Sequence, residues 1–103
     1  MTQRSALRHT HRTLRQVMTV ARARMASGEL PCGTAPLRMW GGYGSGKVCV
    51  VCGKAIERAE VEIEVEETVG GTPKLVGWFH GVCQSIWQRE CARAARFSIV
   101  AEA

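Results

Sequence analysis

The chain has 103 residues, a net charge of +5 and an apolar content of 46 %, which excludes an intrinsically disordered protein and leaves room for one small domain. No apolar run reaches the length of a secretory signal core or of a membrane span. We therefore expect a cytoplasmic protein without membrane contact. Residues 1–28 contain no acidic residue, so an organelle transit peptide is an alternative for that segment.

The first predicted element is a basic amphipathic helix in residues 1–28. Neither glycine nor proline interrupts Ser5–Ala26, and its apolar side chains recur at steps of three, four and seven residues. Residues 1–30 hold six arginines against a single glutamate. Arginines spaced along a helical face can neutralise a nucleic-acid backbone. The candidate contact residues on this helix are Arg4, Arg8, Arg12, Arg15 and Arg22.

Residues 29–47 are rich in glycine and proline and show no hydrophobic period, which predicts a loop. Trp40 and Tyr43 are the aromatic residues of this loop. We expect them to fold back over the small core, because aromatic side chains bury much apolar area. The alternative is a stacking platform for bases or for a peptide, which makes both residues candidate partner contacts.

Residues 48–97 form the predicted zinc-binding domain, which is organised by two pairs of metal-ligand residues. Cys49 and Cys52 form the first pair, His80 and Cys83 form the second, and each pair encloses two residues. Three thiolates and one imidazole make a complete tetrahedral shell for one Zn²⁺ per chain. Such a metal is a common substitute for hydrophobic burial in small domains. Two alternatives remain: a metal-free cluster of reduced side chains, and a redox dithiol formed by the first pair.

The residues between and after the two pairs predict a β-hairpin followed by a helix. Glu60–Glu66 alternates strictly between glutamate and apolar residues, as a half-buried strand does. Val69–Lys74 has the composition of a turn, and Leu75–Phe79 predicts the returning strand. A helical apolar pattern covers about Gly81–Arg96, and residues 98–103 are a tail. The predicted fold is a small α+β zinc domain of the treble-clef type (knuckle, hairpin, helix), preceded by the basic helix.

The other cysteines and histidines are not expected to bind the metal. Cys91 lies eight residues beyond Cys83, which is about 12 Å along a helix and too far to share one ion. We expect Cys91 to be a small buried hydrophobic residue. Cys32 lies in the loop and could approach a site that four better-spaced ligands already complete. In a reducing cytoplasm, paired cysteines favour metal binding over disulfides. His9 and His11 have no ligand partner nearby.

The segment of residues 49–87 resembles the zinc finger of poly(ADP-ribose) polymerases. The resemblance is carried by the ligand spacing and by four apolar residues: Ile56, Trp78, Phe79 and Trp87. The segment also looks like half of a LIM domain, and nearly the whole chain resembles small bacterial proteins with a basic N-terminal helix, a Trp-Gly-Gly loop and this finger. The resemblance implies a zinc site and, for the polymerases, recognition of DNA breaks. Here the glutamate face of the hairpin would repel phosphate, so we do not expect the finger itself to contact DNA.

We expect a non-enzymatic protein, because four protein ligands leave a zinc ion no open position and three thiolates make it a weak Lewis acid. The chain also contains no aspartate to act as a general base. The expected function is a regulatory, nucleic-acid-associated module that contacts DNA or RNA through the arginine-rich helix and has no small-molecule substrate. The alternative is a protein-interaction module whose basic helix docks on the acidic hairpin or on a partner protein.

Overall fold

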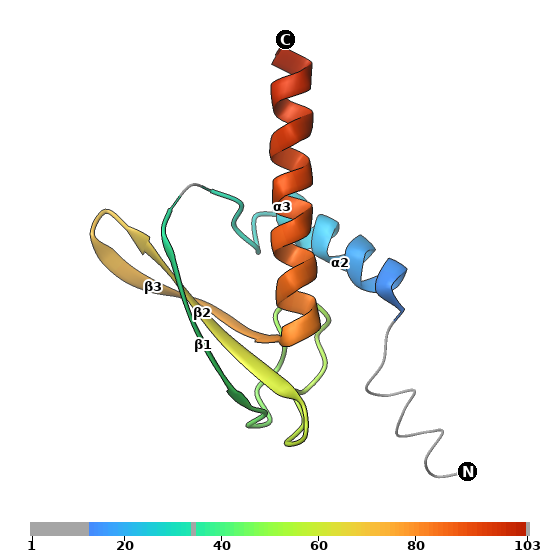
Figure 1. Ribbon diagram of the computed structural model, residues 1–103, viewed down its shortest axis with the longest axis vertical. Helices are drawn as coiled ribbons and strands as arrows, with labels where there is room; N and C mark the ends of the chain where they lie inside the picture. The colour runs from blue at the N-terminus through green and yellow to red at the C-terminus, as the bar shows by residue number, and fades with distance from the viewer. Residues whose placement is uncertain (1–12, 34, 103) are drawn as a thin grey trace.

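The computed structural model describes residues 13–33 and 35–102, with side chains described up to Phe97. Helices and a three-stranded antiparallel sheet follow one another along the chain (Figure 1), which confirms a small α+β protein. The elements are α2 (Leu14–Ala26), β1 (Leu37–Tyr43), β2 (Val61–Val69), β3 (Thr72–His80) and α3 (Gly81–Glu102).

Helix α2 begins later than the apolar periodicity predicts. Thr13 has extended backbone angles, φ −66° and ψ 156°, and its side chain accepts a hydrogen bond from the Gln16 backbone N–H. The Gln16 side chain in turn accepts from the Thr13 N–H, which completes a capping box. The prediction of a continuous helix over Ser5–Ala26 is therefore wrong, because Thr13 has non-helical backbone angles and α2 begins at Leu14. Residues 5–12 lie outside the described part of the chain.

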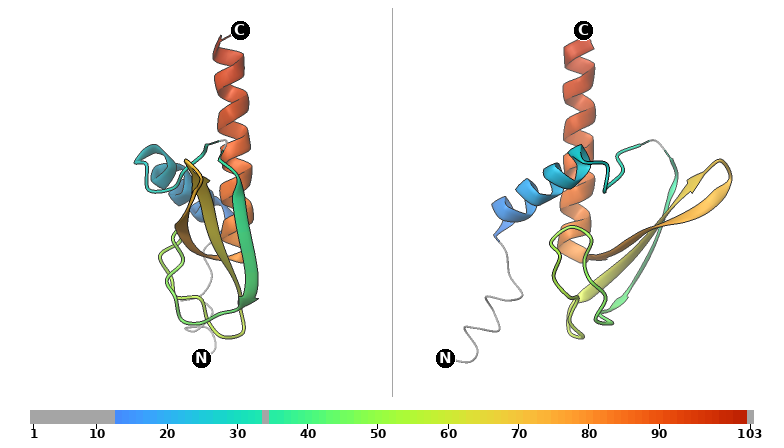
Figure 2. Two further views of the ribbon diagram at one scale, coloured as in Figure 1. Left: turned by 90° about the vertical axis from the view of Figure 1, so that its left-hand side faces the viewer. Right: turned by 180° about the vertical axis from the view of Figure 1, so that it is seen from behind.

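Helix α2 packs against α3, which it crosses near the middle of the molecule (Figure 2). Val17 and Ala21 are buried in this contact. Arg22 Nε donates to the Glu90 carboxylate of α3 at 2.5 Å, and Arg24 Nε donates to the Val51 carbonyl at 2.8 Å. The alternative in which the basic helix covers the glutamates of the hairpin is thus wrong for the described residues, because α2 packs on α3 and makes no contact with β2 or β3.

The predicted hairpin is present and is longer than its alternating pattern. β2 and β3 pair from Glu62↔His80 to Val69↔Thr72, with a bulge between Val65 and Glu66. Gly70 and Gly71 connect them with φ values of 58° and 82°. Two successive positive φ angles are those of a type I′ turn, whose twist matches the flanking strands, and glycine adopts them without steric cost.

Strand β1 lies within the segment predicted as a loop, so that prediction is wrong for residues 37–43. The strand pairs with β2 from Leu37↔Glu67 to Tyr43↔Val61. Its local sequence contains two adjacent glycines and no alternation, but the free edge of β2 provides hydrogen-bond partners that override weak local propensity. Trp40 and Tyr43 do not cover the core as expected: they are 43 % and 85 % exposed on β1.

The core lies between one face of the sheet and α3. Phe79 of β3 stacks on Trp87 of α3 with ring centroids 5.0 Å apart, and Val65 of β2 is fully buried beside them. Helix α3 continues to Glu102, beyond the predicted end at Arg96, so the expected separate tail is helical through residue 102. Within the described residues, neither helix combines the length and the apolar character that crossing a membrane requires.

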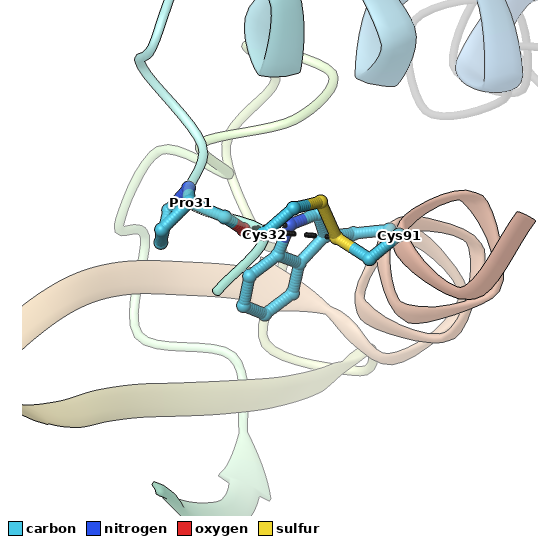
Figure 3. Close-up of a disulfide and its surroundings, with 4 residues drawn as sticks. Pro31, Cys32 and Cys91 are labelled. Atoms are coloured by element: carbon cyan, nitrogen blue, oxygen red, sulfur yellow. Dashed lines mark hydrogen bonds between the residues drawn. A yellow bond between two sulfur atoms is a disulfide. The ribbon is translucent and has the colours of Figure 1, made fainter. Parts of the chain in front are cut away.

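A disulfide joins Cys32, in the connection after α2, to Cys91 on α3 (Figure 3). The two Cα atoms are 5.3 Å apart, and the adjacent Trp87 Nε1 donates to the Pro31 carbonyl at 2.9 Å. The expectation that Cys91 is a small buried hydrophobic residue is wrong, because the docking of α2 on α3 brings Cys32 alongside it and the two form a disulfide. The bond closes a sequence separation of 59 residues and encloses the whole sheet.

We predict that replacing both members of this disulfide, Cys32→Ser together with Cys91→Ser, lowers the free energy of unfolding by about 2–4 kcal/mol, because the unfolded chain regains the freedom of a long loop. Urea denaturation of the metal-loaded protein measures the change. Metal content should stay unchanged, because neither residue belongs to the ligand cluster described below. An unchanged free energy of unfolding would contradict the prediction.

Candidate metal centre

Four side chains from three segments converge on one point beside the core. The ligand atoms of Cys49, Cys52, His80 and Cys83 all lie within 4.8 Å of one another, and all four residues are buried. His80 Nδ1 is 3.3 Å from Cys52 Sγ and 3.9 Å from Cys83 Sγ. Metal–thiolate bonds of about 2.3 Å imply ligand separations of about 3.8 Å in a tetrahedral shell. The donor set and its spacing therefore fit a metal ion, as the two pairs predict.

The first pair sits in a tight turn of residues 48–55. Cys49 N donates to the Lys54 carbonyl, and Gly53 N donates back to the Cys49 carbonyl, both at 2.9 Å. Gly53 has φ +76°, a conformation that side chains disfavour, which explains a glycine directly after the second cysteine. Val50 N donates to the Trp78 carbonyl at 2.9 Å and anchors the turn to β3.

The second pair lies at the junction of β3 and α3. His80 is the last residue of the strand, and Cys83 is in the first turn of the helix, as predicted. The His80 backbone N–H points at Cys49 Sγ at 3.4 Å, so a main-chain donor also stabilises negative charge on that sulfur. The positive end of the helix dipole favours the thiolate form of Cys83.

The three cysteine sulfurs lie so close together that the pKa values of these residues shift in opposite directions. Hydrogen bonds from Cys52 and then from Cys83 hold the pKa of Cys49 far below its usual range. The same contacts with Cys49 raise the pKa of Cys52 and, more strongly, that of Cys83, because a second negative charge beside the first is unfavourable. A cation at the centre would remove this conflict and stabilise all three thiolates.

Glu60 is a member of the site that the sequence analysis did not identify. Its Oε1 lies 3.2 Å from His80 Nε2, and it also accepts the Glu57 N–H at 2.7 Å. A carboxylate on the outer nitrogen keeps the proton there and leaves Nδ1, which faces the sulfurs, free to bind a metal. In an antiparallel hairpin, the start of the first strand lies beside the end of the second. Glu60 directly precedes β2 and His80 ends β3, so the predicted hairpin could have indicated that these two residues meet.

The arrangement argues against both alternatives to a metal ion. A redox dithiol needs only two sulfurs, whereas here a third thiol and an imidazole nitrogen point at the same centre. Apolar packing alone would not direct His80 Nδ1 between two sulfur atoms.

The predicted contact residues are not gathered at one place. Arg4, Arg8 and Arg12, together with His9 and His11, lie outside the described residues. Arg15 is exposed on α2, and Arg22 forms the ion pair with Glu90. Trp40 and Tyr43 lie on β1, in a different element.

A second group of arginines, on α3, was missed because residues 31–103 are neutral in sum. Arg89, Arg93 and Arg96 follow one another at steps of four and three, and so share one side of the helix. Arg15 and Arg22 are seven residues apart on α2 and also share a side. We call these five residues the arginine surface.

Contacts across the helix pair connect the two halves of the arginine surface. Arg22 and Arg93 both pair with the Glu90 carboxylate, at 2.5 Å and 3.7 Å. The hydrogen bond from Arg22 lowers the pKa of Glu90, with smaller contributions from Arg93 and Arg89. Leu14 at the start of α2 lines the same hollow as Arg89. Three members of the arginine surface, Arg22, Arg89 and Arg93, thus act on one buried glutamate.

Comparison with known proteins finds no match among protein-family models, curated sequences or solved structures. The resemblance to the polymerase zinc finger therefore rests on the ligand spacing and the apolar residues around it. The part of that resemblance that the structure confirms is the Cys₃His cluster.

We predict that Glu60→Gln weakens metal binding about 10- to 100-fold, because the amide does not hold the His80 Nε2 proton as a carboxylate does. Competition with a chromophoric chelator measures the affinity. Glu66→Gln is the matched control, since Glu66 lies on the same strand pair several residues from the ligands. Equal affinities for the two variants would show that Glu60 does not position His80.

Proposed function

We propose that Cys49, Cys52, His80 and Cys83 hold one structural zinc ion in a treble-clef domain. Three thiolates and an imidazole are the donors that zinc prefers in closed tetrahedral sites. When bound, the ion would join the turn of residues 48–55, the end of β3 and the start of α3. A shell filled by four protein ligands leaves no position for a substrate, which supports a non-catalytic role.

We predict one zinc ion per chain by native mass spectrometry, and its loss together with the folded state in Cys83→Ser. The double variant Cys32→Ser, Cys91→Ser is the control, because it replaces two cysteines but leaves the ligand set intact. A Cys83→Ser protein that kept both its zinc and its fold would contradict the assignment.

The target that we propose for this module is the phosphate backbone of a nucleic acid, bound by the arginine surface. The observation that carries the proposal is the joining of arginines from α2 and α3 around a single carboxylate, Glu90. Arginine guanidinium groups bind phosphate oxygens in a bidentate manner, and a surface of several such groups gives sequence-independent affinity.

The acidic strand does not oppose this proposal. In β2 the side chains alternate, so Glu62, Glu64 and Glu66 lie on the face opposite Val65, which is buried toward α3. The arginine surface belongs to the helical layer on the other side of the sheet. Phosphate could therefore approach the helices without meeting the glutamates.

We predict that Arg89→Gln combined with Arg93→Gln weakens binding to a short fluorescent DNA duplex or RNA strand and lowers the slope of log affinity against log salt by about two. Fluorescence anisotropy over a salt series measures both quantities. Arg58→Gln is the matched control, because Arg58 lies in the turn between Glu57 and Glu60. Zinc content should be equal in all three proteins.

Absence of salt-dependent binding by the wild-type protein would refute the nucleic-acid proposal while leaving the zinc assignment in place. A loss of affinity in Arg58→Gln that equals the loss per removed charge in the double variant would show that binding depends on net charge alone and not on the arginine surface.

A further inference from the structure

Strand β1 forms one edge of the sheet (Figure 1). Because β2 pairs with one side of β1 alone, half of the backbone groups of β1 point away from β2. Gly44 N donates to the Glu60 carbonyl, and Thr68 N donates to the Pro36 carbonyl. These two bonds show which residues of β1 are hydrogen-bonded to β2, because hydrogen-bonded and non-bonded positions alternate along an antiparallel pair. The residues whose N–H and C=O groups face outward are Leu37, Met39, Gly41 and Tyr43.

This edge has few of the features that usually protect an exposed strand, and Arg38 is its one charged side chain. No proline, lysine or bulge interrupts residues 37–43. Three apolar or aromatic side chains are exposed on it: Met39 by 46 %, Trp40 by 43 % and Tyr43 by 85 %. The opposite edge of the sheet differs, since Val50 of the metal-binding turn donates to the Trp78 carbonyl of β3. Among the described residues, β1 is thus the edge open to another strand.

We propose that β1 pairs with β1 of a second copy of this chain, antiparallel about a two-fold axis at Trp40. In that register Leu37 lies opposite Tyr43 of the second copy, and Met39 lies opposite Gly41 of the second copy. Both positions of each pair carry outward N–H and C=O groups, so every outward backbone group of residues 37–43 receives a partner. The product is a continuous six-stranded sheet with an isologous interface.

The side chains complement one another in this register and so favour a second copy over an unrelated peptide. Trp40 faces Trp40 of the second copy at a non-hydrogen-bonded position, where Cα atoms are about 4.5 Å apart and aromatic pairs interact well. Met39 and Arg38 each face a glycine, which has room for a long neighbour. A Cβ added at Gly42 meets no atom within 4 Å in the single chain.

Charge also matches across the proposed interface. Arg38 and Gly42 lie on the glutamate face of the sheet, because they pair with Glu66 and Glu62 in the ladder. Arg38 faces Gly42 of the second copy, which has no side chain, so the guanidinium can extend across it toward Glu62 of the second copy. Arg38 is the only charged residue of β1, and the register places no like charge opposite it.

Site-specific cross-linking of the zinc-loaded full chain tests both the partner and the register. Trp40→Cys should form a disulfide-linked dimer under mild oxidation, because the paired Cα atoms lie within disulfide reach. Arg38→Cys and Gly42→Cys should each fail alone, since identical residues are then offset by about 13 Å along the strands, but should cross-link when mixed. Wild-type protein controls for reaction of the ligand cysteines. No cross-link in Trp40→Cys, or equal self-linking of all three variants, would overturn the proposal.

Sedimentation equilibrium of the zinc-loaded protein provides the second test. We expect the wild type to show twice the chain mass of 11.3 kDa, and Gly41→Pro to show the mass of one chain, because proline removes one outward N–H without touching the bonds to β2. Gly41→Ala keeps that N–H and should remain dimeric. Trp40→Lys should also be monomeric, because it places two positive charges opposite each other across the axis. This variant tests the same interface without introducing a proline into β1. A monomeric wild type up to about 1 mM would refute the proposal.

Discussion

The convergence of Cys49, Cys52, His80 and Cys83 is the constraint on which the remaining structure depends. Ligand atoms that must lie within a few ångströms of one centre allow no shift in the register of β3 and no rotation of the first turn of α3. Because His80 ends the strand and Cys83 follows it in the helix, the direction in which α3 leaves the sheet is determined at the site. That direction brings Trp87 onto Phe79 and thereby encloses the core.

The second structural layer is formed by the packing of α2 against α3. Val17 and Ala21 of α2 are buried in this contact. Arg22 donates to the Glu90 carboxylate, and Arg24 donates to the Val51 carbonyl. The same docking brings Cys32 to Cys91, so a covalent bond closes the connection that leads into β1. The result is a protein with two chemically different sides: arginines on the helical layer, and glutamates on the outer face of the sheet.

A metal ion held by this cluster would substitute for core size and leave other surfaces available for binding. The buried apolar residues are few, and the sheet keeps exposed aromatic side chains on β1. In larger domains such residues would be drawn into the core. Here they remain at an edge whose backbone groups are unpaired in the described chain, which is why a self-complementary strand is a physically reasonable second interface.

The cluster of three cysteines and one histidine, the hairpin and the helix that carries Cys83 could all be predicted from the sequence, because they depend on short-range patterns: paired ligand spacing, strict alternation and helical periodicity. Most of the remaining features depend on contacts between segments and could not be predicted in this way. Strand β1 exists because β2 has a free edge, Thr13 ends the helix through a local cap, and Glu60 meets His80 because hairpin ends coincide. Cys32 pairs with Cys91, and Arg22 joins Arg89 and Arg93, because α2 packs on α3. Contacts between residues so far apart along the chain produce no periodic pattern in the sequence.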